Sequence, residues 1–150
     1  MIRSITPDDA QEIERLYAQS AAHLRSLGET TDFRLTADVY LRDGFGDRPA
    51  FSGIVAVVED KLTGYLLYTF GYDTDRAMRY LFIIDLLVDG QVRGQGIGKA
   101  LMARAASICR EAGGGKLFWT VYEKNRLALD FYEHLGAREA ADLRFMTLGV

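Results

Sequence analysis

A glycine-rich stretch between two apolar segments constrains the fold of this chain most strongly. It reads VDGQVRGQGIGKALMARAA and runs from Val88 to Ala106. An apolar run precedes it, and a segment with apolar residues at helical spacing follows. Glycine allows the backbone to approach a ligand closely, and a helix N-terminus presents unpaired N–H groups at its positive end. The stretch therefore predicts a strand, an anion-binding loop suited to phosphate, and a helix, with a simple turning loop as the alternative.

Two familiar phosphate-binding motifs do not match this loop. A dinucleotide fingerprint requires glycine three residues after Gly96, where the chain has Lys99. A Walker motif requires glycine where the chain has Arg93, and Ser or Thr where it has Ala100. The pattern that remains is Arg93-x-x-Gly96-x-Gly98, between a strand and a helix.

The remaining elements predict a mixed α/β domain that spans residues 1–150. A short strand at MIRSI precedes a helix that starts with Thr6 and Pro7, and a second helix runs from Thr36 to about Gly44. Three β-rich runs follow with short connections, which predicts an antiparallel meander. After the glycine loop come a helix, a strand at KLFWTV, a helix that Gly136 ends, and a last strand over 143–148. The predicted order is β-α-α-β-β-β-α-β-α-β, with a sheet covered by helices.

Composition removes several classes of function. The net charge is −3 and no run of Lys or Arg is present, so nucleic-acid binding is disfavoured. No apolar run is long enough to span a bilayer and the start lacks a secretion signal, so we expect no membrane association and a cytoplasmic location. The single cysteine, Cys109, excludes an intrachain disulfide, and no metal-binding cluster is apparent.

The glycine loop and a later segment together resemble the GCN5-related N-acetyltransferase (GNAT) family. The later segment is NRLALDFYEHLGA, an Asn followed by a helix with Phe-Tyr that ends at Gly. The order of elements also fits, so the resemblance covers nearly the whole chain. Within the family, the blocks RDGFG, YTFGYD and YEKN are most similar to the diamine acetyltransferases, of the polyamine and thialysine type.

The resemblance implies acetyl-CoA as co-substrate and indicates which residues bind it. The strand before the loop would supply backbone groups to the pantetheine arm and the thioester, and the loop would supply amides to the pyrophosphate. The expected cofactor-binding residues are Leu86, Leu87, Val88, Arg93, Gly94, Gln95, Gly96, Ile97, Gly98, Lys99 and Asn125.

Acetyl transfer to an amine requires that protons move in two places. An amine with a pKa of about 10.4 is protonated at neutral pH and must lose a proton, while the departing thiolate gains one. By resemblance, Tyr132 is the general acid beside the sulfur, with a core aromatic as the alternative. We expect Asp85 or Glu123 to take the amine proton through water, although both could serve only as structural hydrogen-bond partners.

The chain departs from the polyamine-type pattern in its acidic residues. Where those enzymes carry a Glu-Asp pair on the strand before the loop, this chain has Ile84-Asp85. Successive strand residues face opposite sides, so Asp85 cannot replace the missing glutamate unless the strand shifts. The expected substrate-binding residues are Asp73, Asp85 and His23.

These observations favour an enzyme that acetylates a primary amine of a small molecule: a diamine, a polyamine or an amino-acid-like compound. With so few acids, a short or singly charged amine fits better than a long polycation. The alternatives are a protein or peptide acetyltransferase and a non-catalytic acyl-CoA-binding module. The resemblance also implies a homodimer.

Overall fold

The computed structural model describes residues 1–150 and divides them into two compact units, Met1–Thr120 and Val121–Val150. The first holds a five-stranded sheet and three α-helices, and the second holds one helix. None of the helices has both the length and the apolar character that crossing a membrane would require.

The sheet of the first unit has the strand order β1-β2-β3-β4-β5, in which spatial neighbours are also neighbours along the chain. The first three pairs are antiparallel and β4–β5 is parallel, which confirms the predicted meander and the mostly antiparallel sheet. The β4–β5 connection contains a helix, as a parallel pair requires. The strands are β1 Ile2–Ser4, β2 Ser52–Val58, β3 Lys61–Asp73, β4 Met78–Val88 and β5 Gly114–Trp119.

Two helices cover one face of the sheet. They are α1, Ala10–Ser26, and α2, Ala37–Gly44. The start of α1 follows a turn of 3₁₀ helix at Pro7–Asp9, and Thr36 caps α2 by accepting a hydrogen bond from the Val39 amide at 3.3 Å. Both helix starts therefore lie where Thr6-Pro7 and Thr36 predict them.

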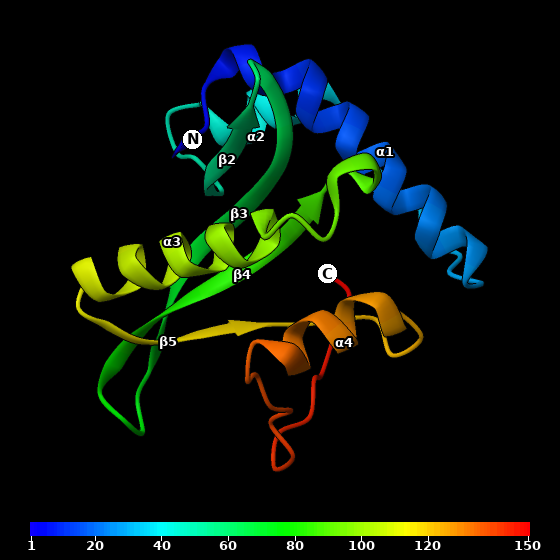
Figure 1. The fold of residues 1–150 in the computed structure, drawn as a ribbon. Coiled ribbons are helices and arrows are strands. Elements are labelled where there is room, and N and C mark those ends of the chain that lie inside the picture. The colour runs from blue at the N-terminus through cyan, green and yellow to red at the C-terminus, as the bar shows by residue number, and fades with distance from the viewer. The chain divides into compact units, whose positions relative to one another are not determined.

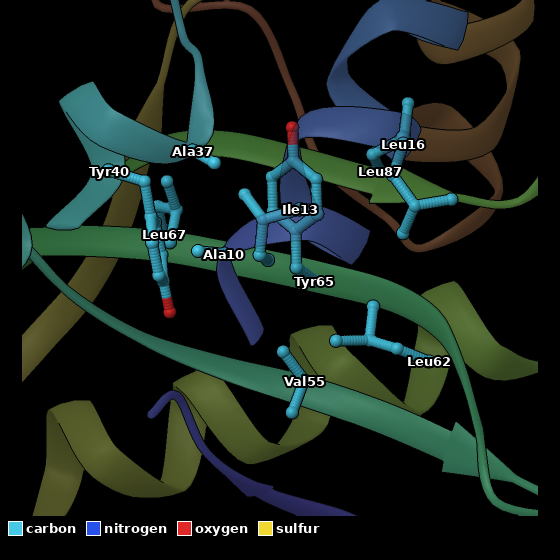
Figure 2. Close-up of a cluster of buried hydrophobic side chains, with 10 residues drawn as sticks. All are labelled: Ala10, Ile13, Leu16, Ala37, Tyr40, Val55, Leu62, Tyr65, Leu67 and Leu87. Carbon is cyan, nitrogen blue, oxygen red and sulfur yellow. The ribbon is translucent and has the colours of Figure 1, made fainter. Parts of the chain in front are cut away.

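The main core lies between these helices and the sheet (Figure 2). Residues three apart on α1 form its helical stripe, and residues of β3, among them the alternate pair Tyr65 and Leu67, meet that stripe. Complete burial of each large apolar side chain contributes about 1.5–3 kcal/mol. The cluster consists of Ala10, Ile13, Leu16, Ala37, Tyr40, Val55, Leu62, Tyr65, Leu67 and Leu87.

The opposite face of the sheet packs against α3, Ile97–Glu111, which lies across β3 and β4 (Figure 1). Gly64 shows how close this approach is. A Cβ atom at Gly64 would lie 3.3 Å from Leu101 and 3.4 Å from Ile97, both on α3. The neighbouring Tyr65 belongs to the core on the other side, as the alternation of a strand requires.

The second unit contains α4, Arg126–His134. Gly136 follows it with φ of +84°, and its amide bonds to the carbonyl of Glu133. This is the left-handed helix stop that the sequence predicts.

The predicted last strand over 143–148 was wrong, because those residues form no regular element. Their apolar side chains are exposed, from 59% at Leu143 to 89% at Leu148. Alternating apolar residues favour a strand, but a strand also requires the backbone of a neighbouring strand. The second unit contains no other strand that could supply one.

Candidate active site

The glycine loop begins at a firmly held aspartate. Asp89 is 8% exposed, and its carboxylate accepts hydrogen bonds from Arg15 of α1 at 2.8 Å and from the Gln91 amide at 3.1 Å. The Asp89 amide also bonds to the Thr63 carbonyl at 2.8 Å. The Gln91 bond and the Arg15 charge hold the pKa of Asp89 below its usual value, so it stays ionised. The end of β4 is thereby fixed to α1 and β3.

The loop itself is exposed and has room for a ligand. Gly94 and Gly96 both have φ of +80°, a conformation that favours glycine, and no atom lies within 4 Å of where a Cβ would be. Gly96 is the N-cap of α3, and no side chain caps this helix end. The first amides of α3 therefore have no partner within the helix and can donate to an anion.

The strand before the loop separates from its neighbour. The pairing of β4 with β5 runs only from Arg79 to Ile83, and the two strands then diverge (Figure 1). Residues Asp85–Val88 remain paired with β3 alone. Their second backbone edge is therefore free of β5, directly before the glycine loop.

A β-bulge occurs at the same point. Ile83 pairs with Tyr68 and Asp85 pairs with Leu67, so Ile84 has no partner on β3. An extra residue bends a strand and changes which side its residues face. Asp85 can replace the missing glutamate only if the strand shifts, and the bulge at Ile84 is such a shift.

Directly after the bulge, Asp85 lies beside a buried tyrosine. The hydroxyl of Tyr65 donates to Asp85 Oδ2 at 2.5 Å, and Tyr65 is fully buried. Burial raises the pKa of Asp85, and the hydrogen bond from Tyr65 opposes that rise. Burial and the nearby Asp85 charge also raise the pKa of Tyr65, so the tyrosine remains the donor.

Asp73 lies far from this pair. It ends β3, six positions beyond Leu67, the partner of Asp85, which is roughly 20 Å along the strand. Its carboxylate already accepts hydrogen bonds from Lys116 at 3.0 Å and Arg76 at 3.3 Å. Within one chain, the structure does not bring Asp73 and Asp85 together.

His23 lies in the last turn of α1 and is half-buried. Its Nε2 atom is buried and makes no hydrogen bond to the protein. A buried ring nitrogen without a partner is unusual, so His23 remains a candidate for binding a polar ligand.

The second unit holds three further residues that the sequence predicts for the active site. Asn125 is the N-cap of α4, and its Oδ1 accepts from the Ala128 amide at 3.3 Å. Tyr132 is half-buried on α4 with its ring 5.2 Å from that of Phe131, and Glu123 is exposed before the helix.

Sequence reasoning missed the residues that hold this site in place. The Arg15–Asp89 ion pair joins residues 74 positions apart, and the Tyr65–Asp85 hydrogen bond joins residues 20 apart. Only the Asp-Gly pair at Asp89 carried a local signal, since Asp commonly caps a turn through its own side chain.

The first unit thus combines an open loop whose amides can donate to an anion, a strand with a free edge and a half-buried carboxylate. The model of the acetyltransferase (GNAT) family matches residues 11–137, which is most of the chain. The protein belongs to the GNAT family. The resemblance seen in the sequence and the predicted fold class are both confirmed.

Relatives of this GNAT protein include named acetyltransferases. Thialysine N-epsilon-acetyltransferase from Bos taurus is 28% identical over 150 residues, covering 95% of this chain and 86% of the relative. Spermidine/spermine N(1)-acetyltransferase-like protein 1 from Homo sapiens is 33% identical over 143 residues, covering 91% of this chain and 20% of that much longer protein. The GNAT protein is therefore an N-acetyltransferase, as predicted.

A solved structure with the same fold comes from Bacillus halodurans. A mutant form of that bacterial protein superposes with a TM-score of 0.81 at 26% identity, and the match covers 100% of this chain and 99% of the other.

Proposed function

We propose that this enzyme transfers an acetyl group from acetyl-CoA directly to a primary amine of a small molecule, either a diamine, a polyamine or an amino-acid-like compound. The observation that carries the proposal is the open glycine loop at the start of α3, directly after the part of β4 that β5 leaves unpaired. GNAT acetyltransferases use acetyl-CoA as co-substrate, and this loop has the form that a diphosphate requires.

The chain's own residues would bind the co-substrate through backbone groups. The amides from Gly94 to Lys99 donate to the diphosphate, and Arg93 adds positive charge. The free edge of Leu86–Val88 bonds to the pantetheine arm and polarises the thioester carbonyl, while Asn125 supplies a further contact. Acetyl-CoA supplies the reactive acetyl group and a thiol with a pKa of about 8.5, which leaves readily as a thiolate.

Three proton movements complete the proposed reaction. Asp85 or Glu123 takes a proton from the ammonium group through water, and the neutral nitrogen attacks the acetyl carbonyl. As the C–S bond breaks, Tyr132 donates a proton to the departing sulfur, and the second proton that the nitrogen loses on becoming an amide restores the Tyr132 hydroxyl. Asp85 is suited to the first task, because its carboxylate is held in one orientation and the residue is still partly exposed.

A short amine suits the carboxylates that the first unit provides. Asp85 lies roughly 20 Å from Asp73, and Asp73 is already in ion pairs. The name of the bovine relative, a thialysine acetyltransferase, supports an amino-acid-like acceptor. His23 remains a proposed substrate contact, whereas a short amine at Asp85 does not reach Asp73 of the same chain. We further propose a homodimer, which light scattering at assay concentration tests.

The experiment is thiol release from acetyl-CoA with a panel of amines and peptides. Turnover with diamines or amino acids supports the proposal. Turnover with peptides alone favours a peptide acetyltransferase, and tight acetyl-CoA binding in calorimetry without turnover indicates a binding module. Absence of any heat on titrating acetyl-CoA would overturn all three.

A further inference from the structure

We propose that Tyr65 is a positioning residue of this reaction, which binds one oxygen of Asp85 and leaves the other to accept a hydrogen bond from the amine or its bridging water. This inference rests on the proposed function. It adds a residue on β3, within the core, to the acyl-acceptor site.

The sheet register explains why these two side chains meet. Tyr65 pairs with Leu87 and Leu67 pairs with Asp85, so Tyr65 and Asp85 are diagonal neighbours on adjacent strands. A diagonal pair is separated by 7–8 Å at the backbone, which a short side chain cannot span but a tyrosine can. The Tyr65 ring lies within the core cluster, so its hydroxyl has a fixed position (Figure 2).

The bulge and the separation of the strands make this position distinctive. Asp85 lies two residues beyond Ile83, the last residue of β4 that pairs with β5. The carboxylate is thus anchored from β3 at the point where β4 becomes free on its other edge. The hydrogen bond between Tyr65 and Asp85 therefore links the buried core to the end of β4 that β5 leaves unpaired.

A second buried tyrosine shows that stability alone does not require a carboxylate. Tyr40 is also fully buried, and its hydroxyl donates to the backbone carbonyl of Thr6 at 2.9 Å. A neutral carbonyl satisfies a buried hydroxyl without burying a charge. Tyr65 instead bonds to a carboxylate whose pKa burial raises, an arrangement that disfavours the charged form. Such an arrangement is expected where the carboxylate has a chemical task.

The hydroxyl also affects when Asp85 is ionised. A hydrogen bond to a carboxylate favours the charged form, so the bonds from Tyr65 and the Leu86 amide oppose the effect of burial on the pKa of Asp85. Tyr17 of α1 is the other titratable side chain whose charge acts on Tyr65. Removing the Tyr65 hydroxyl therefore raises the pKa of Asp85 further.

The test compares Tyr65→Phe with Tyr40→Phe, since each removes one buried hydroxyl and one hydrogen bond. We expect Tyr65→Phe to move the acidic limb of kcat/KM for the amine to higher pH and to lower kcat/KM at pH 6 by about ten-fold or more. Acetyl-CoA affinity should not change. Tyr40→Phe should lower Tm to a similar extent and leave the pH profile of the wild type in place.

Carbon-13 NMR of the Asp85 carboxyl group supplies a readout that does not depend on turnover. Its pKa should be higher in Tyr65→Phe than in the wild type and unchanged in Tyr40→Phe. An active wild type with identical profiles and carboxyl titrations in both variants would overturn the role of Tyr65 alone. A wild type that acetylates no amine would overturn the proposed function as well.

If Tyr65→Phe does not fold, Asp85→Asn decides the matter. Loss of the acidic limb in Asp85→Asn shows that the group to which the Tyr65 hydroxyl bonds is the one that must ionise, as the positioning role requires. An unchanged acidic limb contradicts that role.

Discussion

The two halves of β4 differ in a way that separates stability from function. From Arg79 to Ile83 the strand pairs with β5 on one edge and β3 on the other. Beyond the unpaired Ile84, residues Asp85–Val88 pair with β3 alone and lead into the glycine loop. Proteins normally protect a free strand edge, because its unpaired N–H and C=O groups attract other chains. Here the free edge lies where a ligand would use those groups.

Side-chain burial changes at the same point. Leu81 is fully buried and Ile83 is 3% exposed, whereas Ile84 after them is 44% exposed, and of the residues that follow only Leu87 returns to the core. The first half therefore holds the sheet together. The second half holds the groups that we propose bind a ligand, and burying a carboxylate there costs stability, a division often found at functional sites.

The largest expected effect is on stability and tests Arg79–Ile83, the half of β4 that is paired on both edges. Leu81→Ala removes a side chain between Phe70 of β3 and Leu117 of β5, so we expect a loss of about 2–5 kcal/mol in the free energy of unfolding. Denaturant titration measures the loss. The folded fraction should keep its kcat, and a fall in kcat with stability unchanged would contradict the division.

The next effect concerns the glycine loop. Gly96→Val places a Cβ where the loop is open and strains a residue with φ of +80°. Loss of one or two amide bonds to the diphosphate should weaken acetyl-CoA binding about 100-fold, measured by calorimetry.

The matched control is Gly113→Val at the other end of α3. Gly113 has φ of +75° and similar open space around it, so the two variants carry similar strain. Gly113→Val should keep the affinity for acetyl-CoA. Equal losses of affinity in both variants would show that strain, and not the loop, is responsible.

A smaller effect, on kcat, tests whether the reaction also requires Tyr132, which lies outside Ile84–Val88, the open half of β4 that β5 leaves unpaired. Tyr132→Phe removes the proposed acid, and we expect kcat to fall about ten-fold or more while acetyl-CoA affinity stays nearly constant. The contribution is modest because thiolate already leaves well. Steady-state kinetics measures it, and a kcat equal to that of the wild type would remove Tyr132 from the mechanism.

Local sequence predicted the elements and the loop, because their signals lie within a few residues. Thr6-Pro7 and Thr36 start the first two helices, and the glycines around Gly96 predict the loop before α3. The final strand failed for the same reason, since alternation in residues 143–148 carries no information about a partner strand.

The contacts that shape the site could not be predicted, because they depend on pairing across strands. The bulge at Ile84 results from the register between β3 and β4. That register in turn decides that the Tyr65 hydroxyl reaches the Asp85 carboxylate. Resemblance to a family pointed to Asp85, but only the structure shows its hydrogen-bond partner.

The smallest expected effect is on stability, and its sign distinguishes the open half of β4 from the paired half. Burial raises the pKa of Asp85 in the folded state above its unfolded value, near 3.8, so the ionised carboxylate disfavours folding. The stability contribution of Asp85 is therefore full below the unfolded pKa and declines as pH rises through the folded pKa. Asp85→Asn keeps the shape without the charge, so its Tm should exceed that of the wild type at pH 7, and the difference should vanish near pH 3. Thermal unfolding across pH measures this, with kcat/KM lowered in the same variant. A lower Tm at pH 7 would mean that the charge stabilises the fold, and Asp85 would then belong with Leu81 and not with the loop.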